Sequence, residues 1–182
     1  MNDREQLLLE WLGTVLPAPL ARIAPASSDA SFRRYFRVWY DGQTRIVMDA
    51  PPDKEDCRPF VAIARALRGL GLNTPEVLAG DLDRGLLLLT DLGSRQYLAE
   101  LDPRSVPGLY GDALAALARL QASGDPGSPL LPPYDSALLH REMELFREWF
   151  LSRLLGLDLR EDEHDTLDRA FALLADNALE QP

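Results

Sequence analysis

Short apolar runs separated by turn residues fill the first half of the chain, whereas apolar residues repeat at helical spacing through most of the second half. The first pattern predicts strands at residues 20–26, 34–40, 45–50, 75–79 and 86–89. The pair Asp41-Gly42, between the second and third runs, is a preferred two-residue hairpin turn. The leucines at 86–89 are too few for a helix or a membrane span, so they fit a buried strand. We therefore expect five antiparallel strands.

The helical spacing predicts helices that begin near Asp3, Arg58, Asp112, Leu138 and Asp158. The helix from Arg58 to about Leu70 separates the third strand from the fourth, so it must cross over the sheet. Asp158 and Glu161 have the spacing of a capping box, which would begin the last helix. The proline-rich segment 124–133 predicts a loop. The expected fold class is α+β, with a strand-rich part followed by a helical part.

The composition is that of an ordinary globular protein with an acidic balance. Of 182 residues 46% are hydrophobic, and 29 Asp and Glu outnumber 19 Lys and Arg. The net charge of −10 repels nucleic acid and anionic membranes, so neither is an expected partner. The sequence shows no signal peptide or apolar span, and its single cysteine, Cys57, allows no internal disulfide. We therefore expect a soluble cytoplasmic protein, and the scattered histidines predict no structural metal.

The apolar run continues into Thr90-Asp91-Leu92-Gly93, where the strand-rich half gives way to the helical half. In kinases, a short extended segment at this place binds adenine through its backbone groups. A core strand with a polar end is the alternative interpretation.

Residues 27–34, Ser-Ser-Asp-Ala-Ser-Phe-Arg-Arg, connect the first two predicted strands, where kinases have the loop that covers the ATP phosphates. Hydroxyl and backbone N–H groups can bind phosphate oxygens, and Arg33 or Arg34 can add a bidentate charge. The segment lacks the glycines of a G-x-G-x-x-G loop, so an ordinary hairpin loop is the alternative.

The third strand carries Met48 and Asp49 where a protein kinase has its phosphate-binding lysine. A cation for the phosphates must then come from elsewhere, and Asp49 could equally be a solvated strand end. Neither His140 nor His164 begins the catalytic pattern His-x-Asp-x-x-x-x-Asn, so we interpret both as helix-surface residues. We assign no catalytic or metal-binding residue within these 182 residues.

Four segments follow one another in an order that resembles the aminoglycoside-phosphotransferase-like kinases: SFRRYFRV (31–38), MDAPP (48–52), NTPEVL (73–78) and LLLTDLG (87–93). The likeness extends over essentially the whole chain. It is greatest to members that phosphorylate the C1 (anomeric) hydroxyl of N-acetylmuramate or N-acetylglucosamine in peptidoglycan recycling. It implies a protein-kinase-like fold, with residues 1–93 as small lobe and hinge and 94–182 as the beginning of a helical large lobe.

The resemblance also implies ATP, Mg²⁺ and an amino sugar as ligands. Its ATP-site residues would be a phosphate loop (Ser28, Ser31, Arg33, Arg34), an adenine pocket (Val47, Met48) and a hinge (Leu89, Thr90, Asp91, Leu92). The family's catalytic loop and magnesium-binding aspartate would come after the last predicted helix, beyond Pro182. The chain alone would then be inactive and could self-associate through the apolar face of helix 138–154. The alternatives are an aminoglycoside or other small-molecule kinase, or a nucleotide-binding or interaction module without activity.

Overall fold

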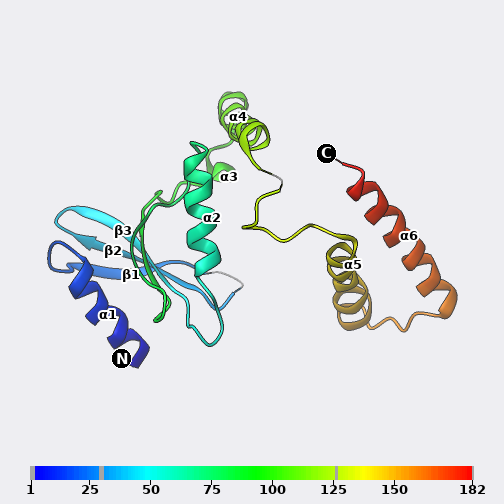
Figure 1. The fold of residues 1–182 in the computed structure, drawn as a ribbon, viewed down its shortest axis with the longest axis horizontal. Helices are drawn as coiled ribbons and strands as arrows, with labels where there is room; N and C mark the ends of the chain where they lie inside the picture. The colour runs from blue at the N-terminus through cyan, green and yellow to red at the C-terminus, as the bar shows by residue number, and fades with distance from the viewer. Residues whose placement is uncertain (1–2, 29–30, 126, 182) are drawn as a thin grey trace. The chain divides into compact units, whose positions relative to one another are not determined.

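The structure is a computed structural model, which describes residues 3–28, 31–125 and 127–181. Its strands are β1 (Arg22–Ser28), β2 (Arg34–Tyr40), β3 (Gln43–Asp49), β4 (Val77–Asp81) and β5 (Leu86–Thr90). They form one antiparallel sheet in the order β1-β2-β3-β5-β4 (Figure 1). The five-stranded antiparallel prediction is therefore confirmed, although β1 and β4 each lie two residues later than expected.

The helices are α1 (Asp3–Val15), α2 (Arg58–Gly69), α3 (Tyr97–Glu100), α4 (Val106–Ser123), α5 (Ser136–Leu145), the π-helix η1 (Phe146–Leu154) and α6 (Glu161–Leu179). The chain divides into two compact units, one up to Leu130 and one from Leu131. The first unit holds the sheet and α1 to α4, and α2 is the predicted crossover helix. The predicted lobe boundary at residue 93 stays a prediction.

The turn between β2 and β3 sets the pairing of these two strands. Asp41 and Gly42 have positive φ angles of 46° and 69°, which match a two-residue hairpin turn to the twist of its strands. Tyr40 pairs with Gln43, and the same register brings Arg34 opposite Asp49 at the far end of the hairpin. The turn therefore places two opposite charges side by side across neighbouring strands.

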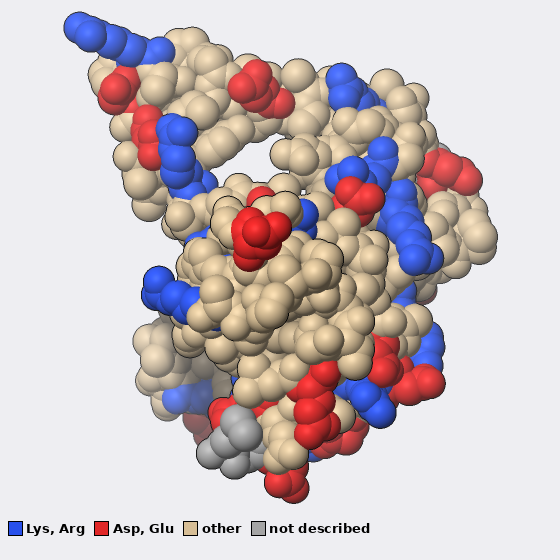
Figure 2. All heavy atoms as spheres, turned by 90° about the vertical axis from the view of Figure 1, so that its left-hand side faces the viewer, with Lys and Arg blue, Asp and Glu red and all other residues tan. Residues whose placement is uncertain are grey.

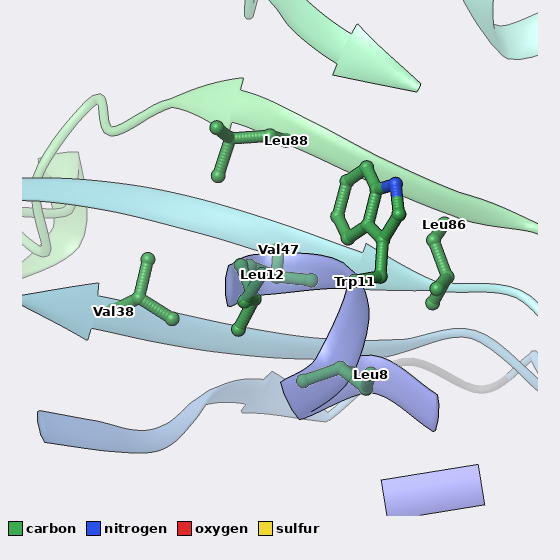
Figure 3. Packing of buried hydrophobic residues seen from close by; sticks show 7 residues of the cluster. All are labelled: Leu8, Trp11, Leu12, Val38, Val47, Leu86 and Leu88. Atoms are coloured by element: carbon green, nitrogen blue, oxygen red, sulfur yellow. The ribbon is translucent and has the colours of Figure 1, made fainter. Parts of the chain in front are cut away.

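Helices cover both faces of the sheet, which explains why β5 is an unbroken apolar run. Leu86 and Leu88 pack under α1, together with Trp11 and other apolar side chains (Figure 3). Leu87 and Leu89 point to the other face and pack in the cluster beneath α2. All four are buried, and each contributes about 1.5–3 kcal/mol by leaving water.

The second unit is a pair of packed helical segments, and it corrects one sequence-based prediction. α5 continues directly into η1, so the predicted helix up to about Gly156 is present, but its second half is π-helical. The last helix is capped by Arg160, whose backbone N–H donates to Glu163 at 2.9 Å. The predicted capping box at Asp158 and Glu161 is therefore wrong, because Glu161 is already the first helical residue. No helix of the described ranges has the length and apolar character needed to cross a membrane.

Candidate functional site

A cavity of about 410 Å³ opens at the end of β5, on the sheet face that α2 covers. All four predicted hinge residues, Leu89 to Leu92, line this hinge cavity. Tyr35, Ile46 and Phe60 contribute its apolar and aromatic walls. The cavity thus combines apolar and aromatic walls with an edge formed by the segment that ends β5 and follows it.

An ion pair fixes the shape of the hinge. Arg37 on β2 donates to both carboxylate oxygens of Asp91, at 2.6 and 3.0 Å, and also to the carbonyl oxygen of Gly93. The same carboxylate accepts a hydrogen bond from the backbone N–H of Gly93 at 2.8 Å. The hydrogen bonds from Arg37 lower the pKa of Asp91, and those to Asp91 raise the pKa of Arg37. The turn after β5 is therefore held in one conformation by a largely buried, bidentate contact.

Thr90 ties the hinge to the start of β4. Its hydroxyl accepts from the backbone N–H of Glu76 at 3.0 Å, and its own N–H donates to the Glu76 carbonyl at 3.0 Å. Within the described residues, the backbone of Leu92 forms no hydrogen bond with another backbone group. Leu92 itself lines the hinge cavity.

The structure places the two predicted adenine-pocket residues on opposite faces of the sheet. Val47 is fully buried in the cluster under α1, so the structure does not bring it to the hinge cavity. Met48 lies on the α2 side of the sheet but is fully buried in the cluster beneath α2 and does not line the hinge cavity. Ile46, on the same face of β3, lines the cavity. Successive residues of a strand alternate between faces, so Val47 and Met48 cannot both line one pocket.

A second cavity, of about 380 Å³, lies beside the β1–β2 connection, and we call it the loop cavity. Ser31, Arg33 and Arg34 line it, together with Ser27 and Tyr35, which also line the hinge cavity. The two cavities are therefore adjacent, and three of the four predicted phosphate-loop residues lie at the second one. The fourth, Ser28, ends β1 opposite Arg34, and only its backbone is described. Asp29 and Ala30 of the predicted loop lie outside the described residues.

Asp49 is the only buried charged residue in the described part of the chain, with 0% of its side chain exposed. Arg4 of α1 donates to one carboxylate oxygen at 2.8 Å, and Arg34 of β2 donates to the other through Nε at 3.0 Å and through Nη2. Arg4 also donates to the carbonyl oxygen of Arg84 at 2.6 Å. The interpretation of Asp49 as a solvated strand end is therefore wrong. It is an anchor that ties α1, β2 and β3 together.

Arg33 has a different partner on the other side of the sheet. Its Nε donates to Glu55, in the segment before α2, at 3.2 Å. Glu55 also accepts from the backbone N–H of Phe32 at 3.2 Å. The Arg33 side chain further lines a cavity beside Phe60 and Pro75, two residues that also line the hinge cavity. The two predicted phosphate-binding arginines therefore lie in different electrostatic surroundings.

Sequence reasoning missed four residues that shape the site, namely Tyr35, Arg37, Ile46 and Glu55. The hairpin register could have indicated three of them, Tyr35, Arg37 and Ile46. It pairs Arg37 with Ile46 and places Tyr35 on the same face of the sheet as Met48. Glu55 gave no such signal, because it lies in an irregular segment.

The described ranges bring together no group of three His, Cys, Asp or Glu side chains that could bind a metal ion. On the face drawn in Figure 2, acidic and basic side chains are interspersed, without a continuous basic patch among the described residues.

A five-stranded antiparallel sheet with a crossover helix on one face is consistent with the strand-rich part of a protein-kinase-like fold. The comparison with known families agrees, because residues 22–182 match the model described as "Phosphotransferase enzyme family". The chain belongs to this phosphotransferase family.

Curated relatives are similar along most of the chain. It is 46% identical over 195 aligned positions to the N-acetylmuramate/N-acetylglucosamine kinase of Pseudomonas aeruginosa, covering 100% of this chain and 57% of the relative. The proteins of the same name from Pseudomonas putida and Neisseria meningitidis are 47% and 34% identical, over 90% and 99% of this chain and 48% and 54% of theirs. The chain thus spans about half the length of the curated relatives it matches.

Proposed function

We propose that this chain forms the ATP-binding part of a kinase that transfers the γ-phosphoryl group of ATP to the C1 hydroxyl of N-acetylmuramate or N-acetylglucosamine. The hinge cavity, with all four predicted hinge residues along its edge, is the observation that carries the ATP site. The acceptor rests on the names of the relatives, which are 34–47% identical over 90% or more of this chain.

Adenine suits the hinge cavity because it has two apolar faces and one hydrogen-bonding edge. Ile46, Leu89 and the rings of Tyr35 and Phe60 would contact the faces. The N–H and C=O of Leu92 would bind the edge, which needs no particular side chain. The Arg37–Asp91 ion pair holds this backbone in place before the nucleotide arrives, which lowers the ordering cost of binding.

The phosphates would extend from the hinge cavity into the adjacent loop cavity. Ser27 and Tyr35 lie at both, and Ser31, Arg33 and Arg34 supply hydroxyl and guanidinium donors at the second. The net charge of −10 disfavours a polyanion at long range, so binding depends on these local donors.

The part of the reaction assigned to these residues is binding and orientation of ATP. Phosphoryl transfer depends mainly on positioning and on neutralising charge, and bound Mg²⁺ would supply the latter. The group that acts on the sugar hydroxyl is assigned outside residues 1–182, since neither histidine begins the catalytic pattern. A cytoplasmic location, where ATP is available, is part of the proposal.

Self-association of the isolated chain is also part of the proposal. Phe146, Trp149 and Phe150 of η1 are each about half exposed, and the rings of Phe146 and Phe150 stack at 5.3 Å. An apolar patch of this kind on a separate chain favours contact with a second copy. Light scattering should therefore show species larger than a monomer, and a monomer at all concentrations would contradict this.

Filling the cavity tests the ATP site. Ile46→Trp should block the hinge cavity and abolish adenosine and ATP binding in calorimetric titrations, because the indole would occupy the space of the base. Ile23→Trp is the matched control, since Ile23 lines an apolar cavity of about 240 Å³ between α1 and the sheet. The control variant should bind like the original chain. Loss of binding only in Ile23→Trp would contradict the proposed site.

A further inference from the structure

The two arginines that end the β1–β2 connection are not equivalent. Arg34 points to the α1 face, where it binds Asp49 through two of its nitrogens. Arg33 points to the α2 face, the side of the hinge cavity, where its Nε binds Glu55. Neighbouring residues of an extended chain point to opposite sides, which accounts for this difference.

Arg34 is needed to neutralise the buried carboxylate of Asp49. The Asp49 carboxylate is fully buried, so withdrawing Arg34 would leave a charge out of contact with water and held only by Arg4. Any N–H group that Arg34 offers to a phosphate must therefore be one that Asp49 does not use. Of the two arginines, Arg33 is the one that lies on the side of the hinge cavity, and its partner Glu55 is not fully buried.

Arg33 keeps donors for a ligand while it is held in place. The contact with Glu55 uses one N–H of a guanidinium that carries five, and Tyr35 also hydrogen-bonds the side chain. The side chain is 28% exposed at the edge of the loop cavity. Glu55 is only 14% exposed and binds the backbone of Phe32 as well. One carboxylate thus fixes both the loop backbone and the direction of the Arg33 side chain.

The geometry points to Glu55 as the positioning residue for Arg33, which binds the β- or γ-phosphate of ATP in place of the missing third-strand lysine. In protein kinases that lysine is held by a glutamate of the crossover helix. Here the carboxylate comes from the segment immediately before the crossover helix, and the cation comes from the phosphate loop. The inference rests on the proposed ATP site and adds to it a named cation and the residue that orients it.

The test is a mutant cycle read with two ligands, ATP and adenosine, in calorimetric titrations of the 182-residue chain. Arg33→Ala should weaken ATP about ten- to a hundred-fold, the usual loss for a hydrogen bond to a charged group, and leave adenosine within about two-fold. Glu55→Ala should weaken ATP less, and the double variant should be no weaker than Arg33→Ala alone, because Glu55 acts through Arg33. Arg33→Lys should restore part of the loss.

Two further variants separate a specific effect on ATP binding from an effect on folding or on surface charge. Glu55→Gln retains an acceptor for the Phe32 N–H and removes only the charge, so it separates orientation of Arg33 from folding of the loop. Arg58→Ala removes an exposed arginine that pairs with Asp56 and Asp83, and its ATP affinity should not change.

An unchanged ratio of ATP to adenosine affinity in Arg33→Ala would overturn the assignment and leave the adenine site intact. Independent, additive losses in the double variant would overturn the positioning role of Glu55. Failure of the original chain to bind adenosine or ATP would overturn the proposed ATP site itself, and this inference with it.

Discussion

Replacing Asp49 with alanine removes a buried charge that joins α1, β2 and β3. Loss of one partner from a fully buried ion pair typically costs about 3–5 kcal/mol. The side chains of Arg4 and Arg34 are 22% and 40% exposed, so both can regain water once the carboxylate is gone. We therefore expect a smaller loss in the free energy of unfolding, about 2–4 kcal/mol.

Urea unfolding followed by tryptophan fluorescence measures this loss. The substitution Trp149→Phe in all samples confines the signal to Trp11 and Trp39, which lie in the unit that contains the sheet. Asp53→Ala is the matched control, because Asp53 forms an exposed pair with Lys54 at 3.6 Å. The control should change stability by no more than about 0.5 kcal/mol.

Arg4→Ala gives a second check on the same anchor. Its cost should be smaller than that of Asp49→Ala, because the carboxylate keeps the contacts from Arg34. A loss below about 1 kcal/mol in Asp49→Ala would refute the view that this residue is an anchor, since it would be no larger than that of a surface pair.

The remaining predictions concern the hinge and the reaction. Because Arg37 lowers the pKa of Asp91, this pair stabilises the fold above about pH 3.9, the value in an unfolded chain, and its contribution disappears as the pH falls through the lowered pKa. The stability difference between the original chain and Asp91→Asn should therefore shrink in acid, and a pH-independent difference would contradict this. Thr90→Ala removes the bond from the Glu76 N–H and should cost about 1 kcal/mol of stability, with ATP affinity changed only a few-fold; abolished binding in a folded variant would exclude backbone recognition. In a coupled assay of ADP release, this chain should not phosphorylate N-acetylmuramate or N-acetylglucosamine, and turnover of about 1–100 per second would show that the catalytic groups lie within it.

The sheet could be predicted because its signals are local. A two-residue turn at Asp41-Gly42 sets the β2–β3 register, and that register alone places Arg34 opposite Asp49. The contact of Arg4 with Asp49 joins residues 45 positions apart and depends on how α1 packs, which no local pattern encodes. Asp49 could therefore be located on its strand from the sequence but not recognised as buried.

The end of an apolar run predicts a hinge, and a cavity lies at these residues, but the sequence indicates only some of the residues that form the cavity walls. Val47 was placed in the adenine pocket by resemblance, although strand alternation already separates it from Met48. The Arg37–Asp91 contact spans 54 positions, so it becomes visible only in the folded chain. Glu55 lies in the irregular segment before α2, 22 positions after Arg33, and no local pattern links the two residues.

Backbone amide chemical shifts give a direct test of whether adenine binds along the hinge. Adenosine titrated into the ¹⁵N-labelled chain should shift the amide signals of Asp91, Leu92 and Ile46 most strongly, since these residues line the hinge cavity. Leu8 and Leu9, which line the cavity under α1, should be unaffected. Shifts confined to α1, or no shifts at millimolar adenosine, would contradict the account.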